Sequence, residues 1–460
     1  MNPSDRPLPP KAFIRVDDKP SRVAAWTVFW VAMAFAVIAL PFVVILLGED
    51  RPEAGAVLWE FSMGCGFAAL AMVLLQFAMT SRIRWITAPF GADILYVVHR
   101  IASWGVLALA LLHFGVLYIW YEPALGALNP LKAPWELTIA RLALVCFGLL
   151  ILTSELRKRL NLPYRAWRLI HIAIGTVGTA AALLHVLGVG NYTEMAGSRA
   201  LWLGLFAGWI VFMLWSRMVR PFLLARHPWR VISNEMERGG VHTLTLRPEG
   251  APLRGWKPGQ FAWLSLGHAP WKLRDHPFTI STAPDRGPEI SFSIKPLGDD
   301  SEQMAKAAPG TVAYVEGPYG TFSIDREAKA EGFVMIAGGV GITPILANLH
   351  ALHSRNDPRP VILIYANSTL EEASFREELE EIAKDIPLTI VHVPEEAPAD
   401  WQGETGRIDK ALLARHLPDV TRAWPHMLCG PAPLITAATK ALISMGTPAH
   451  QVTSEVFDMV

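Results

Sequence analysis

Two stretches of equal length decide the fold: HRIASWGVLALALLH at residues 99–113 and HIAIGTVGTAAALLH at residues 171–185. Each stretch begins and ends with a histidine and is otherwise nearly all apolar. A separation of 14 residues on an α-helix falls about 40° short of four full turns and rises about 21 Å. Both histidines of a stretch therefore lie on one helix face, near opposite boundaries of a bilayer core that is about 30 Å thick.

The first half of the chain predicts six transmembrane helices. A bilayer core requires about 20 apolar residues per helix, and long uncharged stretches fill the first 220 residues. The fourth stretch is short and must extend back past Arg141, but its position between two clear spans argues for it. The expected spans are residues 23–47, 61–81, 101–121, 142–154, 169–190 and 200–216.

The distribution of cations predicts the orientation of these spans. The N-terminus and the loops after the second and fourth spans hold most of the Lys and Arg of this half, including Arg157, Lys158 and Arg159. Such residues stay preferentially on the cytoplasmic side. We therefore expect a multi-pass protein of the inner (plasma) membrane, with both termini and the second half of the chain in the cytoplasm.

The first half contains four histidines, His99, His113, His171 and His185. The third and fifth spans run in the same direction, so His99 is level with His171 and His113 is level with His185. Two facing imidazoles at each of two depths predict two stacked b-type haems with bis-histidine ligation. Packing roles are the alternative, but the matched spacing favours ligands, and zinc is disfavoured because ligands about 21 Å apart cannot share one ion.

A resemblance strengthens this interpretation. The His99-Arg100 dipeptide, the paired histidines and YRAWRLIH at residues 164–171 resemble the ferric reductase/NADPH oxidase superfamily. The resemblance implies that the four histidines ligate an inner and an outer haem. Arg100, Arg165 and Arg168 then either neutralise propionates of the inner haem or anchor the helices at the cytoplasmic surface. Arg141 is expected near the outer haem, either attracting an anion or snorkelling.

The second half begins with short strands separated by Gly and Pro turns, which predicts an antiparallel barrel from about Pro228 onward. The segment RDHPFTIS at residues 274–281 resembles the flavin motif of the ferredoxin–NADP reductase superfamily, and SIKPLGDDS at residues 293–301 resembles its next FAD segment. The resemblance implies that Thr279 hydrogen-bonds the isoalloxazine and that Lys295 and the following turn hold pyrophosphate. The implied FAD-binding residues are His276, Pro277, Phe278, Thr279, Lys295, Gly298 and Ser301.

A glycine-rich turn marks the nucleotide-binding part. A buried strand at 332–336 leads into AGGVGITP at residues 337–344, where glycines let the backbone approach a pyrophosphate at a helix N-terminus. Further strands at 361–365, 388–393 and 427–428 predict a doubly wound sheet. The implied NADPH- or NADH-binding residues are Gly338, Gly339, Gly341, Thr343, Pro344, Gly430 and Pro431.

The same resemblance implies roles for two further residues. Cys429 is expected beside the nicotinamide, with a buried packing role as the alternative. Phe457 would shield the flavin until nicotinamide displaces it, with simple packing as the alternative. The sequence indicates the choice between NADH and NADPH less clearly. NADPH-selective relatives often carry Arg just after the second strand of the nucleotide-binding sheet, whereas this chain has Ser368 there, which favours NADH.

Composition excludes several other classes of protein. Lys+Arg and Asp+Glu number 41 each, and this balance gives no indication of nucleic-acid binding. Cys65, Cys146 and Cys429 lie far apart without C-x-x-C spacing, which argues against disulfides, thiolate zinc sites and iron–sulfur clusters.

The predicted fold is a six-helix transmembrane bundle, an antiparallel β-barrel FAD domain and an α/β doubly wound nucleotide-binding domain, with a cytoplasmic lead-in. The expected boundaries are residues 1–22, 23–220, 226–327 and 330–460.

The order of these parts predicts the function. Nicotinamide gives up two electrons as hydride and each haem iron accepts one, so a flavin must stand between them. We expect an oxidoreductase that moves electrons from cytoplasmic NADPH or NADH through FAD and two b-type haems to a small diffusible acceptor outside, either a ferric chelate or oxygen, giving superoxide. An alternative is a cytochrome subunit that supplies a periplasmic redox partner or quinone. A transporter is disfavoured because the spans lack acidic pairs.

Overall fold

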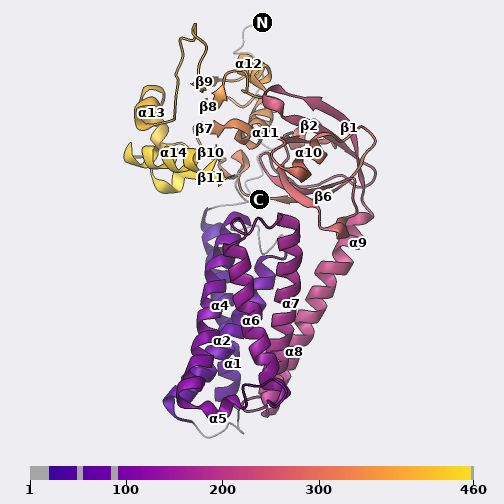
Figure 1. Cartoon of the computed structure of the whole chain (residues 1–460). Coiled ribbons are helices and arrows are strands. Elements are labelled where there is room, and N and C mark those ends of the chain that lie inside the picture. Colours follow the sequence, from indigo (N-terminus) through magenta and orange to yellow (C-terminus); the bar gives the residue numbers. More distant parts are fainter. Residues whose placement is uncertain (1–19, 49–54, 84–91, 457–460) are drawn as a thin grey trace. The chain divides into compact units, whose positions relative to one another are not determined.

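The computed structural model describes residues 20–48, 55–83 and 92–456, and Figure 1 shows how their helices and strands are arranged. The chain divides into a helical unit, Pro20–Arg220, and a second unit that follows from Pro221. Most of the predicted N-terminal segment and Phe457 lie outside the described residues.

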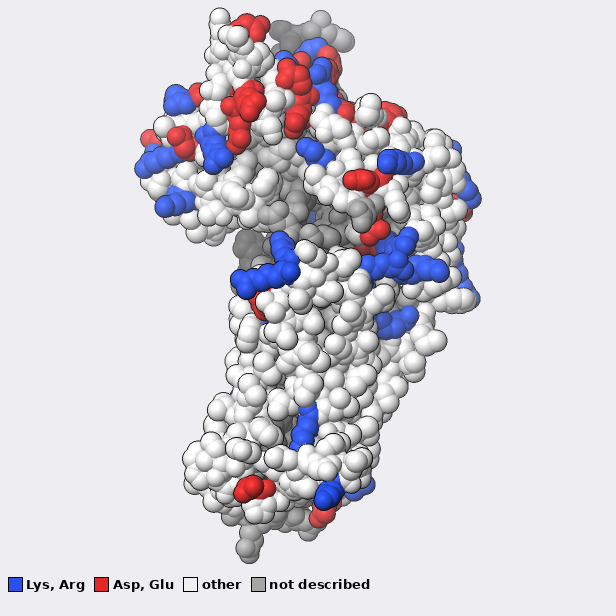
Figure 2. Space-filling view, viewed as in Figure 1, with Lys and Arg blue, Asp and Glu red and all other residues white. Residues whose placement is uncertain are grey.

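Six helices of the described residues are long and apolar enough to cross a membrane, which confirms the predicted number of spans. The face drawn in Figure 2 is almost free of charged side chains over most of this unit's length. The helices are α1 (Pro20–Leu47), α2 (Val57–Met79), α4 (Ala92–Trp120), α6 (Trp135–Glu155), α7 (Tyr164–Val189) and α8 (Ala196–Leu214), with a short α5 (Glu122–Leu125) before α6.

The fourth span is longer than the uncharged stretch that predicted it. Helix α6 begins at Trp135 rather than Leu142 and includes Arg141. The guanidinium of Arg141 donates hydrogen bonds to backbone carbonyls of the preceding segment, including that of Leu125, so its polar groups are satisfied within the helical unit.

The helices pack in pairs that bring the histidine-bearing spans together. Helix α4 packs along α2, and α7 packs along α6, with a further contact between α4 and α6. Helix α8 continues through a π-helical turn, Trp215–Val219, into α9 (Arg220–Ala225) at the division between the units.

The first part of the second unit is an antiparallel sheet in the order β4-β3-β6-β1-β2-β5. A bridge from Ile280 to Phe292 joins the residue after β4 to β5, so the two edge strands meet and the sheet closes into a barrel. The strands are β1 (Trp229–Met236), β2 (His242–Pro248), β3 (Phe261–Leu266), β4 (Asp275–Thr279), β5 (Ile290–Ile294) and β6 (Val312–Tyr319), with α10 (Asp299–Ala305) between the last two.

The second part is a parallel sheet in the order β11-β10-β7-β8-β9. Alternate residues of β7 enter different cores: Met335 packs with α11 and α12, whereas Val334 packs with α13 and α14. Helices therefore cover both faces, as a doubly wound sheet requires. The strands are β7 (Phe333–Gly338), β8 (Val361–Thr369), β9 (Leu388–Glu396), β10 (His426–Gly430) and β11 (Val452–Val456), and the helices are α11 (Ile342–Ser354), α12 (Arg376–Asp385), α13 (Lys410–His416) and α14 (Ala432–Ser444).

These observations confirm the predicted fold class, from the transmembrane bundle to the doubly wound sheet. The glycine-rich turn leaves β7 and enters α11, and the predicted flavin motif runs along β4, so both candidate motifs lie at the positions expected from the sequence.

Candidate functional site

His99 of α4 and His171 of α7 face each other at one depth of the helical unit. Their ring centres are 6.3 Å apart. Two metal–imidazole bonds of about 2 Å, with about 1.1 Å from each nitrogen to its ring centre, place the ring centres of two axial ligands about 6.2 Å apart. The Nδ1 atom of His99 is buried and has no hydrogen-bond partner within the part of the chain that the structure describes. The pair therefore has the separation that one iron atom between two imidazoles requires.

Cationic and aromatic side chains lie near this pair. Arg100 forms a two-pronged ion pair with Glu155, at 3.0 and 2.8 Å, so the structure gives this arginine a protein partner. The ring of Trp167 lies 5.1 Å from that of His171, and the guanidinium of Arg157 lies over the Trp167 ring. A role in binding propionates stays a prediction for Arg100, Arg165 and Arg168.

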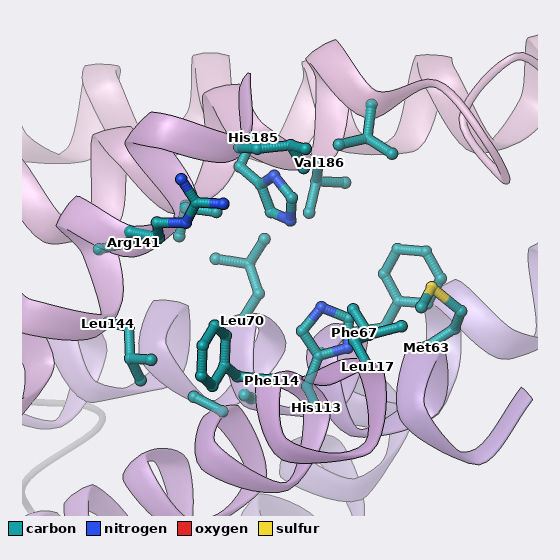
Figure 3. Close-up of a pocket in the computed structure, with 18 of the residues that line it drawn as sticks. Met63, Phe67, Leu70, His113, Phe114, Leu117, Arg141, Leu144, His185 and Val186 are labelled. Carbon is teal, nitrogen blue, oxygen red and sulfur yellow. The ribbon is translucent and has the colours of Figure 1, made fainter. Parts of the chain in front are cut away.

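His113 and His185 form the second pair and line a cavity whose empty volume is about 1150 Å³, including its open mouth. Figure 3 shows the two imidazoles pointing toward each other across this space. The cavity lies between two imidazoles and has a mainly apolar lining, which suits a porphyrin ring ligated by both histidines. The apolar lining includes Met63, Phe67, Leu70, Phe114, Leu117, Leu144 and Val186.

Backbone carbonyls fix the orientation of both rings. Nδ1 of His113 lies 2.8 Å from the carbonyl oxygen of Ser62, and Nδ1 of His185 lies 3.0 Å from that of Glu136. Because a carbonyl only accepts, each Nδ1 carries the proton and each Nε2 keeps its lone pair. A metal-bound histidine usually has this arrangement.

Sequence reasoning missed the residues that orient these rings. Ser62 and Gly66 are four residues apart on one face of α2, and a Cβ on Gly66 would lie 3.3 Å from Nδ1 of His113. Two small residues at this spacing indicate a close helix contact and were the available signal. Nothing in the sequence pointed to the carbonyl of Glu136, because a backbone acceptor has no side-chain signature.

The flavin motif runs along β4, which pairs with β3. Thr279 ends this strand, and its Oγ1 atom is buried without a hydrogen-bond partner among the described residues. Since buried hydroxyl groups are nearly always hydrogen-bonded, this atom fits the role of binding a flavin ring. Phe278 packs against the barrel core beside it.

The other predicted FAD-binding side chains have partners within the chain. Nε2 of His276 lies 3.2 Å from Asp300, and Nζ of Lys295 lies 3.7 Å from Glu372. The hydroxyl of Ser301 accepts hydrogen bonds from the backbone N–H groups of residues 297 and 298 and so caps α10. Roles for these residues and for Pro277 in binding FAD stay predictions.

The glycine-rich turn packs tightly against the end of β10. A Cβ on Gly341 would lie 2.3 Å from the carbonyl oxygen of Cys429, and one on Gly338 would lie 2.8 Å from Leu434. Gly339 has a φ of +52°, in the left-handed region that favours glycine. Because these glycines have no side chains, the predicted nucleotide-binding turn can lie directly beside the segment Cys429–Pro431. The Thr343 hydroxyl donates to the carbonyl of residue 340 within the turn.

Cys429 is fully buried at the end of β10, opposite Glu455 of β11. Burial, and secondarily the nearby carboxylate of Glu455, raise the pKa of the Cys429 thiol well above its usual value. The side chain is therefore a neutral thiol at physiological pH rather than a thiolate nucleophile. Its placement beside a nicotinamide stays a prediction, as does the shielding role of Phe457.

Comparison with known proteins identifies curated relatives for part of the second unit. The chain is 36% identical over 166 residues to NADH-cytochrome b5 reductase 1 of Lodderomyces elongisporus, covering 35% of this chain and 55% of that protein. The corresponding protein of Candida albicans is 34% identical over 166 residues, covering 35% and 56%. The chain thus spans little more than half the length of these relatives.

Among solved structures, the chain resembles the FAD/NAD-binding domain of a nitric oxide dioxygenase from Vibrio cholerae, with 22% identity and a TM-score of 0.44, covering 50% of this chain and 98% of that one. It also resembles a flavohemoglobin from Malassezia yamatoensis, with 15% identity and a TM-score of 0.45, covering 88% and 99%.

Two protein families match separate parts of the chain. Residues 65–182, which include His99, His113 and His171, match the family described as "Ferric reductase like transmembrane component". Residues 335–440, which include the glycine-rich turn and Cys429, match the family described as "Oxidoreductase NAD-binding domain". The chain is therefore a multi-pass membrane protein that combines a ferric reductase-like transmembrane component with an oxidoreductase NAD-binding domain.

Proposed function

We propose that this chain moves electrons from cytoplasmic NADH or NADPH, through FAD and two b-type haems, to an acceptor on the opposite side of the membrane. The observation that carries the proposal is the arrangement of the four histidines. Helices α4 and α7 present one facing pair at each of two depths, with 6.3 Å between the ring centres of His99 and His171 and a cavity between His113 and His185.

When bound, FAD would accept a hydride and release single electrons, and each haem iron would exchange one electron. The chain's own residues hold and orient these groups. The carbonyls of Ser62 and Glu136 keep the protons of His113 and His185 on Nδ1, which leaves Nε2 for the iron. The surrounding apolar helices exclude water and ions from the path.

In the second unit, the main role of the side chains and backbone would be to position the flavin and the dinucleotide. The free hydroxyl of Thr279 would hydrogen-bond the flavin ring. The bare backbone of Gly338 and Gly341 lets the nucleotide-binding turn approach both the end of β10 and a dinucleotide phosphate. No covalent nucleophile is needed for hydride transfer, which agrees with the neutral thiol of Cys429.

We propose NADH as the preferred donor. Ser368 lies near the end of β8, and the segment after the strand carries Glu371 and Glu372 and has no Lys or Arg before Arg376. A 2′-phosphate brought to this strand end would meet two carboxylates, and the nearby ammonium of Lys295 lies 3.7 Å from Glu372, which disfavours NADPH. Relatives named NADH-cytochrome b5 reductase support the same preference.

The proposed acceptor is a small diffusible oxidant, a ferric chelate or oxygen, since bis-histidine ligation leaves no axial position for a substrate. The proposed location is the inner (plasma) membrane with both termini in the cytoplasm, as the cation distribution indicates. A second candidate function is a cytochrome subunit that supplies a periplasmic protein or a quinone. Reduction of a soluble acceptor by the isolated chain would argue against this second candidate.

The test uses the purified full-length chain in lipid nanodiscs. The wild-type protein is expected to bind two haems per chain and to show NADH-driven haem reduction. The His113→Ala variant is expected to lose one haem and acceptor reduction while retaining electron transfer from NADH to flavin. The matched control is His227→Ala, because His227 is exposed and lies outside the helical unit. A wild-type chain without haem absorbance, or full acceptor reduction by His113→Ala, would reject the proposal.

A further inference from the structure

Arg141 occupies an unusual position inside the second histidine pair's cavity. It projects from α6, and Figure 3 shows its side chain together with His113 and His185. Apart from the histidines, it is the one ionisable cation among the described residues that line the cavity, and the lining contains no Asp or Glu. The remaining walls are mainly aliphatic and aromatic.

The guanidinium is held in a fixed orientation without being neutralised. Nη1 donates to the carbonyl of Ala127 at 2.9 Å, and Nη2 donates to that of Leu125 at 2.6 Å. These acceptors satisfy N–H groups but carry no net charge. Within the described part of the chain, Arg141 forms no ion pair with a carboxylate, in contrast to Arg100, which is paired with Glu155.

An uncompensated charge beside apolar walls at membrane depth is costly and usually marks a functional group. A carboxylate is the natural partner, because a planar guanidinium matches two carboxylate oxygens and such a pair is stronger in a low-dielectric site. We infer that Arg141 binds a carboxylate group inside this cavity, beside His113 and His185. This inference rests on the proposed function and specifies the chemistry of the outer end of its electron path.

The carboxylate has two candidate sources. It belongs either to a propionate of the haem held by His113 and His185 or to an acidic acceptor such as a ferric carboxylate chelate that approaches the same edge. Either carboxylate would bind the guanidinium of Arg141 in the same way, but the two would change different measured quantities. A bound propionate influences the haem's midpoint potential, whereas a bound acceptor influences its own KM.

The experiment compares full-length wild type, Arg141→Gln, Arg141→Lys and the control Arg199→Gln in nanodiscs. Arg199 is an exposed arginine near the start of α8 and lies outside the cavity lining. Haem content, midpoint potentials and steady-state kinetics are measured with ferric citrate and with a neutral benzoquinone. The control is expected to match the wild type in every measurement.

If the partner is a propionate, Arg141→Gln lowers the midpoint potential of one haem, because an unneutralised propionate disfavours the added electron, and both acceptors are affected alike. If the partner is the acceptor, the KM for ferric citrate rises about 10-fold or more, while the potentials and the KM for benzoquinone stay unchanged. Either result supports a carboxylate at Arg141.

If the Arg141→Gln variant fails to bind haem, the Arg141→Lys variant still tests the inference. Lysine keeps the charge but lacks the paired N–H groups of the guanidinium, so a lowered potential or a raised ferric citrate KM is expected here too. If Arg141→Lys, or a haem-loaded Arg141→Gln, equals the wild type in potentials and in both KM values, the inference is wrong. Absence of NADH-driven haem reduction in the wild type would instead reject the proposed function.

Discussion

His350 and Ser281 join the two parts of the second unit. The imidazole Nδ1 of His350, on α11, donates a hydrogen bond of 3.1 Å to the carbonyl of Ser281, two residues after the flavin-motif threonine. On its other side, Nε2 of His350 lies 2.7 Å from Glu378 of α12. The imidazole is buried, so this connection is shielded from water and fixes the flavin motif relative to the helix that begins at the glycine-rich turn.

Replacing His350 by alanine is expected to slow flavin reduction by NADH and to destabilise the second unit by about 1–3 kcal/mol, because a buried carbonyl loses its donor. Rapid-mixing absorbance of flavin reduction and thermal unfolding check these effects. His353→Ala is the matched control, since His353 is on the same helix but pairs with Asp385 at the surface, where ion pairs contribute about 0–1 kcal/mol. Equal behaviour of the two variants would contradict a positioning role for His350.

Gly341→Ala is expected to impair nucleotide binding. The added Cβ would lie 2.3 Å from the carbonyl oxygen of Cys429, so the turn and the end of β10 must separate, at a cost of about 1–3 kcal/mol or more. The KM for NADH should rise while haem content stays at two per chain. In the control, Gly250→Ala, the new Cβ meets its nearest neighbour at 3.7 Å, and an unchanged KM is expected. An unaltered KM in Gly341→Ala would show that the turn does not approach the nucleotide.

Gly66→Ala is expected to disturb the outer histidine pair specifically. The new Cβ would lie 3.3 Å from Nδ1 of His113 and compete with the carbonyl of Ser62 for that side of the ring. One of the two haem midpoint potentials should shift, and the other should not, because second-shell partners tune the metal. Potentiometric titration measures both. Gly204→Ala on α8, where a Cβ meets nothing within 4 Å, should leave both potentials unchanged.

The ion pairs of Glu404 predict a pH-dependent stability of the nucleotide-binding part. Hydrogen bonds from Arg415 and then His416 lower the pKa of Glu404 from its ordinary value of 4.5 to about 2. Because the pKa is depressed in the folded protein, this stabilisation is present above about pH 4.5 and disappears as the pH falls toward 2. Glu404→Gln should lower Tm by roughly 2–4 °C at pH 7, and the deficit should shrink at pH 3. A deficit that is independent of pH would refute this assignment.

The architecture was predictable from the sequence where residue types recur at regular spacing along the chain. Helix geometry alone places both histidines of a pair on one helix face, because each pair is separated by 14 residues. The strand pattern of the second half follows from local propensity and turns. Neither depends on knowing which distant residues meet, which is why the six spans, the barrel and the doubly wound sheet were all expected from the sequence.

Pairings between distant side chains were not predictable. Nothing in the sequence pairs Arg100 with Glu155 of α6. Nothing in the sequence pairs Lys295 with Glu372 either, although the two side chains lie 3.7 Å apart. Helix α6 begins seven residues earlier than its uncharged stretch, at Trp135, because backbone carbonyls around Leu125 satisfy the arginine that interrupts it. Such outcomes depend on tertiary packing, which spacing and composition do not encode.

Since both histidines of each helix belong to one uninterrupted α-helix, the length of the proposed electron path is set by the peptide backbone and not by the surrounding lipid. A thicker or thinner membrane changes helix tilt but leaves the rise of about 21 Å between the two sites the same. Insertion of a single residue between His99 and His113 would instead turn one imidazole about 100° away from its partner. Changes to the lipid-facing surface of these helices would therefore leave the spacing of the proposed ligands intact, whereas a change in the number of residues between them would not.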